Sequence, residues 1–284
     1  MKILGIGEIV WDCLPGCRKL GGAPVNFSFY AKELGAESYP VSAVGNDSLG
    51  DEAIEACRTY GLRTDHIQRN ARPTSRVLVK LGEAGVPQYE IVENVAWDTL
   101  EASSPSLALA AEADCICWGS LAQRSEITRN TIKHILKAAP SDCLKVFDIN
   151  IRQHYYSREI VLESLRMADV LKLNEEELPV VLQLTGGLNV QDIIDKYGIR
   201  YVVHTCGASF SEVFSARGLE SHIPTPGGDV VDTIGAGDSF TAAFVTALLG
   251  GCDVRTCHRK AVEVAAYVCA CEGAINPLPA SISI

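Results

Sequence analysis

The chain opens with Lys2-Ile3-Leu4-Gly5-Ile6-Gly7-Glu8-Ile9-Val10, a short and nearly continuous apolar run. Such a run is typical of a strand that is buried on both faces of a sheet. Similar runs recur further along, at Cys115–Trp118, Leu144–Phe147, Val170–Leu173 and Tyr201–His204. Segments with helical spacing separate them, and this alternation predicts an α/β fold with a mostly parallel sheet covered on both faces.

Helices are expected between and after these strands. The first of them places Phe27, Tyr30, Ala31 and Leu34 on one face, which is the spacing of a helix packed against a core. The expected helices include Asn26–Leu34, Gly50–Tyr60, Ser125–Ala139, Ile160–Ala168, Val190–Tyr197, Asp238–Leu249 and Val254–Cys271.

One stretch departs from this pattern. Thr74–Leu81 and Gln88–Val92 alternate between apolar and polar residues on either side of a glycine-containing turn, which predicts a β-hairpin. Together with the short Leu14–Leu20 segment, the hairpin predicts a small β appendage beside the α/β body.

Composition excludes several classes of function. The 284 residues include 25 Lys and Arg against 35 Asp and Glu, a net charge of −10, without any cluster of basic residues, so no nucleic-acid partner is expected. No apolar run reaches the roughly 18–20 residues that span a bilayer, so no membrane role is expected either. The 11 cysteines are spread through apolar segments with no secretory signal before them, so we expect reduced thiols in a cytoplasmic protein.

Common nucleotide-binding motifs are absent. Gly5-Ile6-Gly7 follows a predicted strand, but Val10 stands where a dinucleotide fingerprint needs its third glycine. No glycine-rich turn leads into Gly-Lys-Ser/Thr, so the P-loop is missing as well.

The strongest chemical signal is Asp232-Thr233-Ile234-Gly235-Ala236-Gly237-Asp238-Ser239-Phe240, where small residues lead directly into an apolar helix. Gly-Ala-Gly lets the backbone turn sharply and direct successive N–H groups outward, and the helix N-terminus adds partial positive charge. This turn is a candidate anion site. Asp238 would be an ionised proton acceptor there, or simply the residue that caps the helix.

Three other segments carry polar groups that could contact a ligand. Gly21-Gly22-Ala23-Pro24-Val25-Asn26 brings backbone close to a ligand, and Asn26 could bind a polyol or only cap its helix. Asp148-Ile149-Asn150-Ile151-Arg152 and Asn174-Glu175-Glu176-Glu177 follow buried strands, where ligands gather in parallel sheets. Their carboxylates could hold Mg²⁺ or form the acidic first turn of a helix.

These residues together resemble the PfkB, or ribokinase-like, family of carbohydrate kinases. The N-terminal motif is Gly21-Gly22-x-Pro24-x-Asn26-x-Ser28, with Gly35 and Gly45 after it, and the C-terminal motif is Asp232-Thr233-x-Gly235-Ala236-Gly237-Asp238. Elements similar to the family lie between them, at Gly45–Gly50, Asp148–Arg152 and Asn174–Glu177. Three segments resemble the bacterial fructokinase branch, namely Asn94–Asp98, Gly119–Arg124 and Arg152–Tyr156.

The resemblance implies a single ribokinase-like domain over residues 1–284. Its core would be three α/β/α layers around a mostly parallel sheet, and its small β lid would comprise segments near 12–25 and 66–99. Lids in this family often form dimer interfaces, so a homodimer through the lid is expected.

The resemblance also implies roles for individual residues. Asp238 matches the catalytic base, and Gly235, Ala236 and Gly237 match the anion hole that stabilises the transferred phosphoryl group. Sugar hydroxyls would be bound by Asp12, Gly22, Asn26, Asp98 and Arg152, and the nucleotide by Asn174, Thr205, Gly207 and Asn276. Glu177 would hold Mg²⁺ through water, whereas Asp232, Ile234 and Gly273 would hold a monovalent cation such as K⁺.

Two positions depart from the family pattern. Gly207-Ala208-Ser209-Phe210 lacks the second glycine of the usual adenine-side loop, and Ala274-Ile275-Asn276-Pro277 is close to the commonest tail without matching it. Both concern the nucleotide pocket, so ATP is the expected donor, with another nucleoside triphosphate as the alternative.

The expected function is therefore a sugar kinase that phosphorylates fructose with Mg·ATP. Arg152 keeps 2-keto-3-deoxygluconate open as the acceptor, because related kinases for acidic sugars hold a carboxylate with an arginine there. Another ketose or a nucleoside is a further alternative within the family. An alternative of another class is a non-catalytic protein that senses a sugar or a nucleotide.

Overall fold

The computed structural model describes residues 1–14, 17–81 and 87–282. Its main sheet contains the strands β1 (Lys2–Ile6), β4 (Glu37–Gly45), β5 (Ile67–Asn70), β8 (Cys115–Trp118), β9 (Leu144–Asp148), β10 (Val170–Asn174), β11 (Tyr201–Cys206), β12 (Phe210–Ser215) and β13 (Gly218–Pro224). They lie in the order β13-β12-β11-β10-β9-β8-β1-β4-β5. Every neighbouring pair from β11 to β5 is parallel, whereas β12 and β13 are antiparallel.

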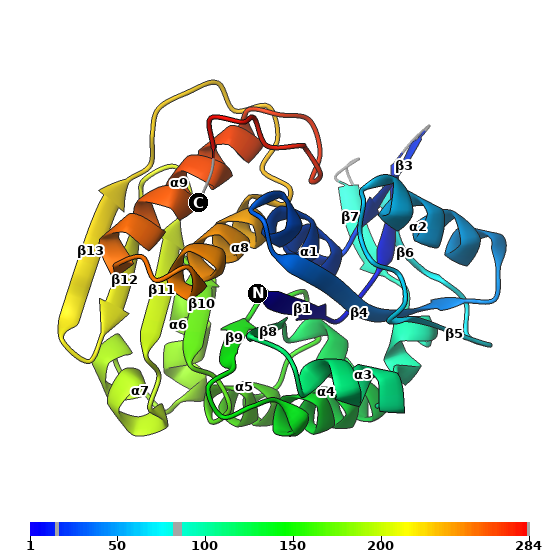
Figure 1. The fold of residues 1–284 in the computed structure, drawn as a ribbon, viewed down its shortest axis with the longest axis horizontal. Helices are drawn as coiled ribbons and strands as arrows, with labels where there is room; N and C mark the ends of the chain where they lie inside the picture. The colour runs from blue at the N-terminus through cyan, green and yellow to red at the C-terminus, as the bar shows by residue number, and fades with distance from the viewer. Residues whose placement is uncertain (15–16, 82–86, 283–284) are drawn as a thin grey trace.

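Helices cover both faces of this sheet (Figure 1). One face carries α1 (Ala23–Glu33), α2 (Ser48–Thr59), α8 (Ala236–Leu249) and α9 (Val254–Cys269). The other face carries α3 (Ser104–Ala110), α4 (Glu126–Ala138), α5 (Arg158–Leu165), α6 (Glu177–Leu184) and α7 (Val190–Tyr197). A separate apolar core fills each side, which confirms the predicted three-layer α/β/α architecture.

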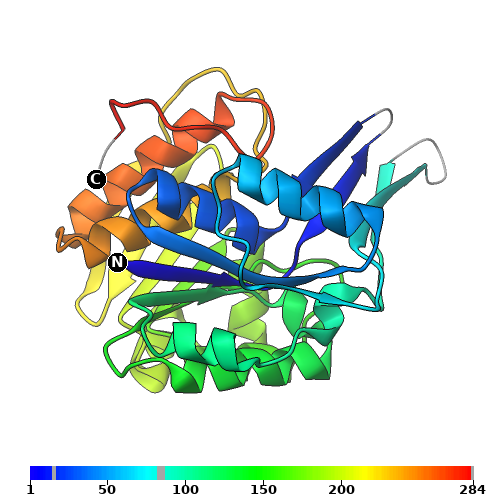
Figure 2. The same cartoon turned by 45° about the vertical axis from the view of Figure 1, so that its right-hand side comes forward.

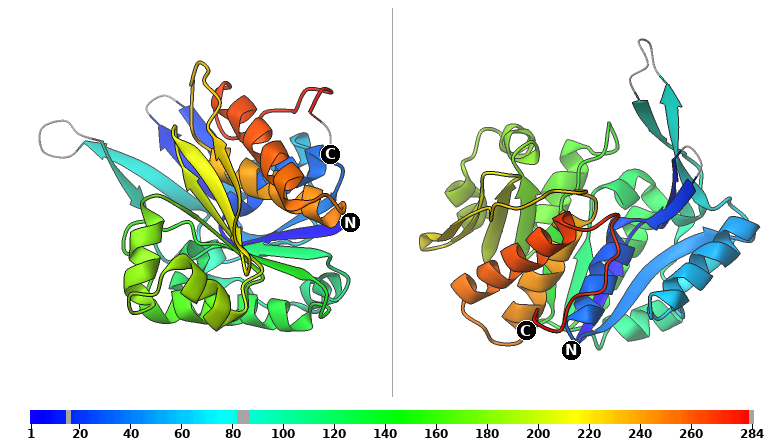
Figure 3. Two further views of the ribbon diagram at one scale, coloured as in Figure 1. Left: turned by 90° about the vertical axis from the view of Figure 1, so that its left-hand side faces the viewer. Right: turned by 90° about the horizontal axis from the view of Figure 1, so that it is seen from above.

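A second, four-stranded sheet forms the lid. Its strands are β2 (Val10–Leu14), β3 (Cys17–Gly21), β6 (Ser75–Leu81) and β7 (Pro87–Ile91), in the order β3-β2-β6-β7. The pairing of β6 with β7 is antiparallel, which confirms the predicted hairpin, although turn residues 82–86 lie outside the described part. The lid projects from the layered body in Figures 2 and 3. Self-association through it stays a prediction.

The prediction of one strand over Lys2–Val10 is wrong. The chain leaves the main sheet after Ile6, and Val10 begins the lid strand β2. Gly7 permits this departure: its φ is 154°, and a Cβ there would lie 2.9 Å from Cγ of Pro24. The opening apolar run therefore connects the core to the lid instead of belonging to one sheet.

Other differences have simple causes. Strand β4 was not predicted because Ser38, Pro40 and Ser42 interrupt its apolar character, yet all three are buried beside β1 and β5. Helix α1 is buried on every side from Pro24 to Ala31, because it packs against both the sheet and α8. The sequence predicted only one buried face for this helix.

The structure also bears on two expectations, namely that the cysteines are reduced thiols and that the chain does not cross a membrane. The cysteines whose side chains are described are all free, and Cys57, Cys115, Cys117, Cys143 and Cys257 are buried. Across the described ranges, no helix combines the length and the apolar character that crossing a membrane requires.

An alanine at Gly22 is expected to destabilise the fold. Gly22 has a φ of 116°, and a Cβ there would lie 2.3 Å from the carbonyl oxygen of Glu8. Backbone would have to move, so we expect Gly22→Ala to lower the free energy of unfolding by about 3 kcal/mol in urea denaturation. Gly186→Ala is the control, because Gly186 has a φ of 90° with no atom near the added Cβ. If both variants lost the same free energy of unfolding, the contact between the added Cβ at Gly22 and the backbone of Glu8 would not be the cause.

Candidate active site

The candidate site lies at the N-terminus of α8. Gly235 adopts left-handed backbone with a φ of 79°, and α8 begins at Ala236, so Asp238 stands in the first helical turn. Nδ2 of Asn26 on α1 donates a hydrogen bond to Oδ2 of Asp238 at 2.8 Å. The amide oxygen of Asn26 is buried without a hydrogen-bond partner among the described residues, so it is available to a ligand hydroxyl.

The carboxylate of Asp238 has an unusual proton affinity. The residue keeps some exposed surface, but its carboxylate lies among protein atoms, and burial together with the charge of Asp148 raises its pKa to about 6. The hydrogen bond from Asn26 and the charges of Lys172 and Arg152 act in the opposite direction. A carboxylate with this pKa is mostly ionised at neutral pH and still binds a proton readily, which suits a general base.

Glu8 is a second carboxylate beside Asp238. It is 5% exposed, and Oε1 accepts a hydrogen bond from the backbone N–H of Ala23 at 3.4 Å. Burial is the main cause that raises its pKa to about 7, and the charge of Asp238 adds to the shift. Glu8, Asp148 and Asp238 line a cavity of about 20 Å³, enough for one water-sized group such as a hydroxyl.

Asp148 and Lys172 form a buried ion pair below α8. Asp148 ends β9, Lys172 lies opposite it on the neighbouring strand β10, and Nζ of Lys172 lies 3.2 Å from Oδ1 of Asp148. Oδ2 of Asp148 accepts a hydrogen bond from the hydroxyl of Thr241 on α8 at 2.8 Å. Burial alone would lower the pKa of Lys172. The negative charges of Asp148, Glu177 and Asp238 have the larger effect, so the pKa of the ammonium group is raised.

Glu177 and Asn174 stabilise the start of α6. The two oxygens of Glu177 accept backbone N–H groups, Oε1 from Ile151 at 2.8 Å and Oε2 from Asn174 at 2.9 Å. The amide oxygen of Asn174 accepts the backbone N–H groups of Glu176 and Glu177. Burial raises the pKa of Glu177, which is 4% exposed. Each carboxylate oxygen keeps a lone pair, so Glu177 fits a contact to a hydrated cation.

The predicted sugar-binding residues Asp12, Gly22 and Arg152 lie around the same carboxylates. The positive charge of exposed Arg152 lowers the pKa values of Glu8, Asp12 and Asp238, so it lies near all three. Burial of Asp12 in the lid strand β2 raises its pKa despite this charge. Gly22 contacts the backbone of Glu8. The structure therefore brings these residues together with Asn26 and Asp238, and their contacts to a sugar stay a prediction.

The predicted cation-binding residues form a compact junction. Oδ1 of Asp232 accepts the backbone N–H of Ile234, and Oδ2 accepts that of Gly273, both at 3.0 Å. The side-chain amide of Asn276 donates to the carbonyl of Gly273 at 2.8 Å. The loop before α8 and the loop after α9 are thus joined, as a shared cation site would require. Binding of a cation and of the nucleotide stays a prediction.

Thr205 and Gly207 lie at the end of β11. The hydroxyl of Thr205 is 3.5 Å from the carbonyl oxygen of Leu173 on β10, and exposed Gly207 has a φ of 45°. A Cβ at Gly207 would lie 3.0 Å from Oε1 of Glu175, directly after β10. These two residues therefore border the strand end that carries Asn174, and their role in nucleotide binding stays a prediction.

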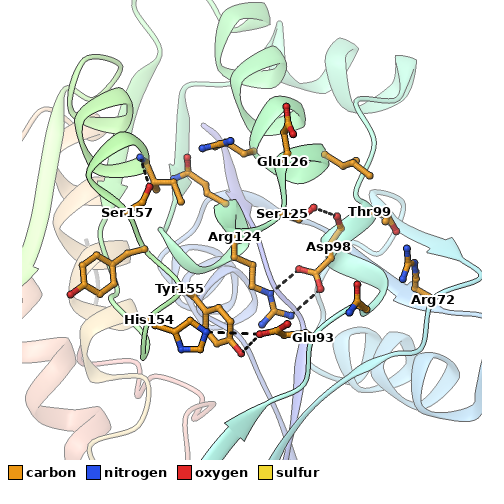
Figure 4. A pocket seen from close by; sticks show the side chains of 16 residues that line it. Arg72, Glu93, Asp98, Thr99, Arg124, Ser125, Glu126, His154, Tyr155 and Ser157 are labelled. Atoms are coloured by element: carbon orange, nitrogen blue, oxygen red, sulfur yellow. Dashed lines mark hydrogen bonds and ion pairs between the residues drawn. The ribbon is translucent and has the colours of Figure 1, made fainter.

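Asp98 lies in a different place, on the short helix η2 (Ala96–Thr99). Asp98 lines a large pocket of about 650 Å³, which is drawn in Figure 4. This pocket shares no lining residue with the cavity beside Asp238. The carboxylate of Asp98 pairs with both Nε and a terminal nitrogen of Arg124, at 2.8 and 2.9 Å, and accepts the N–H of Val95. Other polar groups there also bind one another, for example Glu93 and Tyr155. A sugar contact of Asp98 stays a prediction, and its carboxylate is already engaged.

Two residues of the cluster were missed from the sequence. Lys172 interrupts the apolar run Val170–Leu173, and a charge inside a predicted buried strand was the signal that could have identified it. Glu8 stands in the opening run in the same way. Both are nine-tenths or more buried beside Asp238.

The rate of any reaction that uses Asp238 as a base should fall in acid. Only the ionised carboxylate accepts a proton, so we expect kcat/KM to fall about tenfold per pH unit below a pH of about 6. A pH–rate profile measures this. In Glu8→Gln, which removes the neighbouring titrating group, the acidic limb should remain near the same pH, and its loss would assign the limb to Glu8 instead.

Comparisons with known proteins show the family and the fold of this chain. The sequence model of the pfkB family carbohydrate kinases matches residues 17–281. A fructokinase from Klebsiella pneumoniae is 30% identical over 267 residues, which cover 87% of this chain and 84% of that protein. The structure of a Xylella fastidiosa fructokinase with bound ATP has a TM-score of 0.85 at 22% identity and covers 98% of this chain and 95% of that one. A Pyrococcus horikoshii sugar kinase in complex with ATP has a TM-score of 0.80 at 25% identity, covering 96% and 94%. The fold is therefore ribokinase-like.

Proposed function

The chain belongs to the pfkB family of carbohydrate kinases, and from this premise we propose that it transfers the γ-phosphate of ATP to a hydroxyl of fructose. One observation carries the proposal: Asp238 stands in the first turn of α8, directly after Gly235–Gly237, with its carboxylate hydrogen-bonded to Asn26. A proton acceptor and an anion-binding helix N-terminus at one point are what phosphoryl transfer to a hydroxyl needs.

In the proposed reaction, Asp238 takes the proton of the sugar hydroxyl as its oxygen attacks the γ-phosphorus. The bond from phosphorus to the oxygen that bridges the β- and γ-phosphates breaks, and ADP leaves with the electron pair. Charge spreads over the oxygens of the transferred group. Backbone N–H groups of Gly235 and Gly237 stabilise that charge, because a fixed donor acts without reorganising solvent. The N–H of Ala236 joins them when it leaves its 3.3 Å hydrogen bond to the carbonyl oxygen of Thr233.

The acceptor would lie between the lid and the core. The unpaired amide oxygen of Asn26 accepts one sugar hydroxyl, and Asp12 on β2 and exposed Arg152 contribute further polar groups. The cavity beside Glu8 and Asp238 receives the hydroxyl that reacts. Closing the lid over this space would exclude the water that otherwise hydrolyses ATP.

The described side chains fit a magnesium ion that is shared with the triphosphate. Within these ranges, no three His, Cys, Asp or Glu side chains are close enough together to hold a metal ion. Glu177 and Asn174 would hold it through water, because backbone N–H groups already occupy part of their oxygens. Bound Mg²⁺ supplies positive charge to the phosphates. A potassium ion would lie at the junction of Asp232 and Gly273.

Fructose is proposed because the sequence resembles bacterial fructokinases over most of its length. The test is a panel of acceptors with purified protein and Mg·ATP, with ADP release as the readout. It should contain fructose, other ketoses, 2-keto-3-deoxygluconate and nucleosides. The highest kcat/KM is expected for fructose, and a strong preference for another acceptor would overturn that choice.

Arg152 favours 2-keto-3-deoxygluconate as the second candidate. It is exposed, and its charge acts on Asp12 and Asp238, so a sugar carboxylate bound nearby would find a cation. Arg152→Met should then lower kcat/KM for the acid far more than for fructose. Sugar binding without ADP release at any Mg²⁺ concentration would contradict a kinase and favour a non-catalytic binding protein.

A further inference from the structure

Lys172 is a buried cation whose position calls for a functional explanation. Lys172 is 7% exposed. Among the described residues, its ammonium group forms an ion pair with Asp148. A buried ammonium costs several kcal/mol of solvation unless its partners compensate it. One ion-pair partner leaves two of the three N–H donors of Lys172 for other acceptors.

The ammonium group lies against the first turn of α8. A Cβ added to Gly237 would lie 2.9 Å from Nζ of Lys172, so the ammonium occupies the space that any side chain would need there. This contact explains why the turn has glycine at 237, where the φ angle does not require it. Lys172 therefore stands directly beside the anion hole.

This arrangement brings two positive features together. The N-terminus of α8 carries about half a positive charge, and a lysine at a helix N-terminus is unfavourable for that reason. Asp148, Glu177 and Asp238 compensate this charge in the free protein. The combination favours an anion with several negative oxygens at Gly237, as a phosphoryl group has.

We infer that Lys172 is a catalytic residue that contacts the transferred phosphoryl group and neutralises the charge on its oxygens during transfer. The inference rests on the kinase reaction proposed above, in which the proton goes to Asp238 and ADP leaves with the electron pair. It also accounts for how an acidic protein with a net charge of −10 supplies a fixed positive charge to the phosphates.

The test compares Lys172→Met, which has a similar shape without charge, with Lys172→Arg, which keeps the charge. We expect Lys172→Met to lower kcat about 100-fold or more and to leave the KM for the sugar within about threefold, since removing one such stabilising group costs about 10²–10³ in kcat. Lys172→Arg should retain more activity than Lys172→Met. Rates are measured at pH 8–9, where Asp238 is ionised, so protonation of Asp238 cannot explain a loss.

A binding measurement separates this role from support of the fold. Calorimetry with Mg·ADP and with Mg·AMP-PNP, a non-hydrolysable triphosphate, reports the contribution of the γ-phosphate without any sugar. Lys172→Met should weaken AMP-PNP binding about tenfold or more and leave ADP binding unchanged. A folded Lys172→Met protein with wild-type kcat and wild-type AMP-PNP affinity would overturn the inference.

Two further arms keep the result interpretable. If Lys172→Met does not fold, the substitution is repeated in an Asp148→Asn background, where the carboxylate that pairs with Lys172 is absent, and is compared with Asp148→Asn alone. The same losses in kcat and AMP-PNP affinity are expected there, and their absence would overturn the role. If the wild-type protein releases no ADP with any acceptor, the proposed function fails, whereas the calorimetric comparison still decides the contact of Lys172 with the γ-phosphate.

Discussion

Asp238→Asn should lower kcat by about 10²–10⁴-fold, the range that a positioned general base contributes. Asparagine has nearly the same shape and can still accept the hydrogen bond from Asn26 through its amide oxygen, but it cannot take up a proton from the acceptor hydroxyl. Single-turnover rates with saturating sugar and Mg·ATP measure the effect. Calorimetry should show that the variant still binds both substrates.

The matched control is Asp229→Asn, which changes an exposed aspartate in the loop before α8. It should leave kcat unchanged, because the side chain lies at the surface. An Asp238→Asn protein that keeps more than about a tenth of wild-type kcat would contradict the assignment of the base.

Arg124→Met should cause the largest loss of stability among the ion pairs described. Arg124 and Asp98 are 7% and 10% exposed, their contact is bidentate, and the guanidinium lies 4.0 Å from the ring centre of Trp97 and 4.7 Å from that of Tyr155. The variant would leave the Asp98 carboxylate buried without its cation. We expect the free energy of unfolding in urea to fall by about 3–5 kcal/mol.

Arg129→Met provides the comparison, because Arg129 pairs with Glu159, which is 65% exposed. Arg129 itself is 18% exposed, but its carboxylate partner is solvated, and such a pair contributes about 0–1 kcal/mol. The double variant Arg124→Met/Asp98→Asn should recover part of the loss, because no buried charge remains. A small effect of Arg124→Met, together with a raised KM for sugar in Asp98→Asn, would instead favour a role of Asp98 in binding.

The sequence predicted the elements whose apolar pattern is continuous. Strand β8 and helix α7 have their predicted bounds, whereas α8 begins two residues before its predicted start and α9 ends two residues before its predicted end. It did not predict β4, because Pro40 and the serines look like turn residues until a neighbouring strand and two helical layers bury them. The bend at Gly7 was missed because an apolar run does not show where a chain changes sheets.

The sequence predicts the local motifs of the candidate site, but it does not predict which charged side chains are buried together there. Asp238, Asn26 and Gly235 were found because helix N-termini and glycine turns have recognisable local patterns. Lys172 and Glu8 were not found, because their significance depends on burial beside other charges that are distant in sequence. Asp98 shows the converse: its motif was recognised, but only the fold shows that Arg124 occupies its carboxylate.

The hydrogen bond between Asn26 and Asp238 joins residues 212 positions apart in the chain. During synthesis, the first glycine-rich turn and the lid leave the ribosome long before α8 exists. The two halves of the candidate site therefore meet only after most of the chain has been made. A chain truncated before α8 lacks Asp238 and the turn Gly235–Gly237, so it cannot form the hydrogen bond from Asn26 to Asp238.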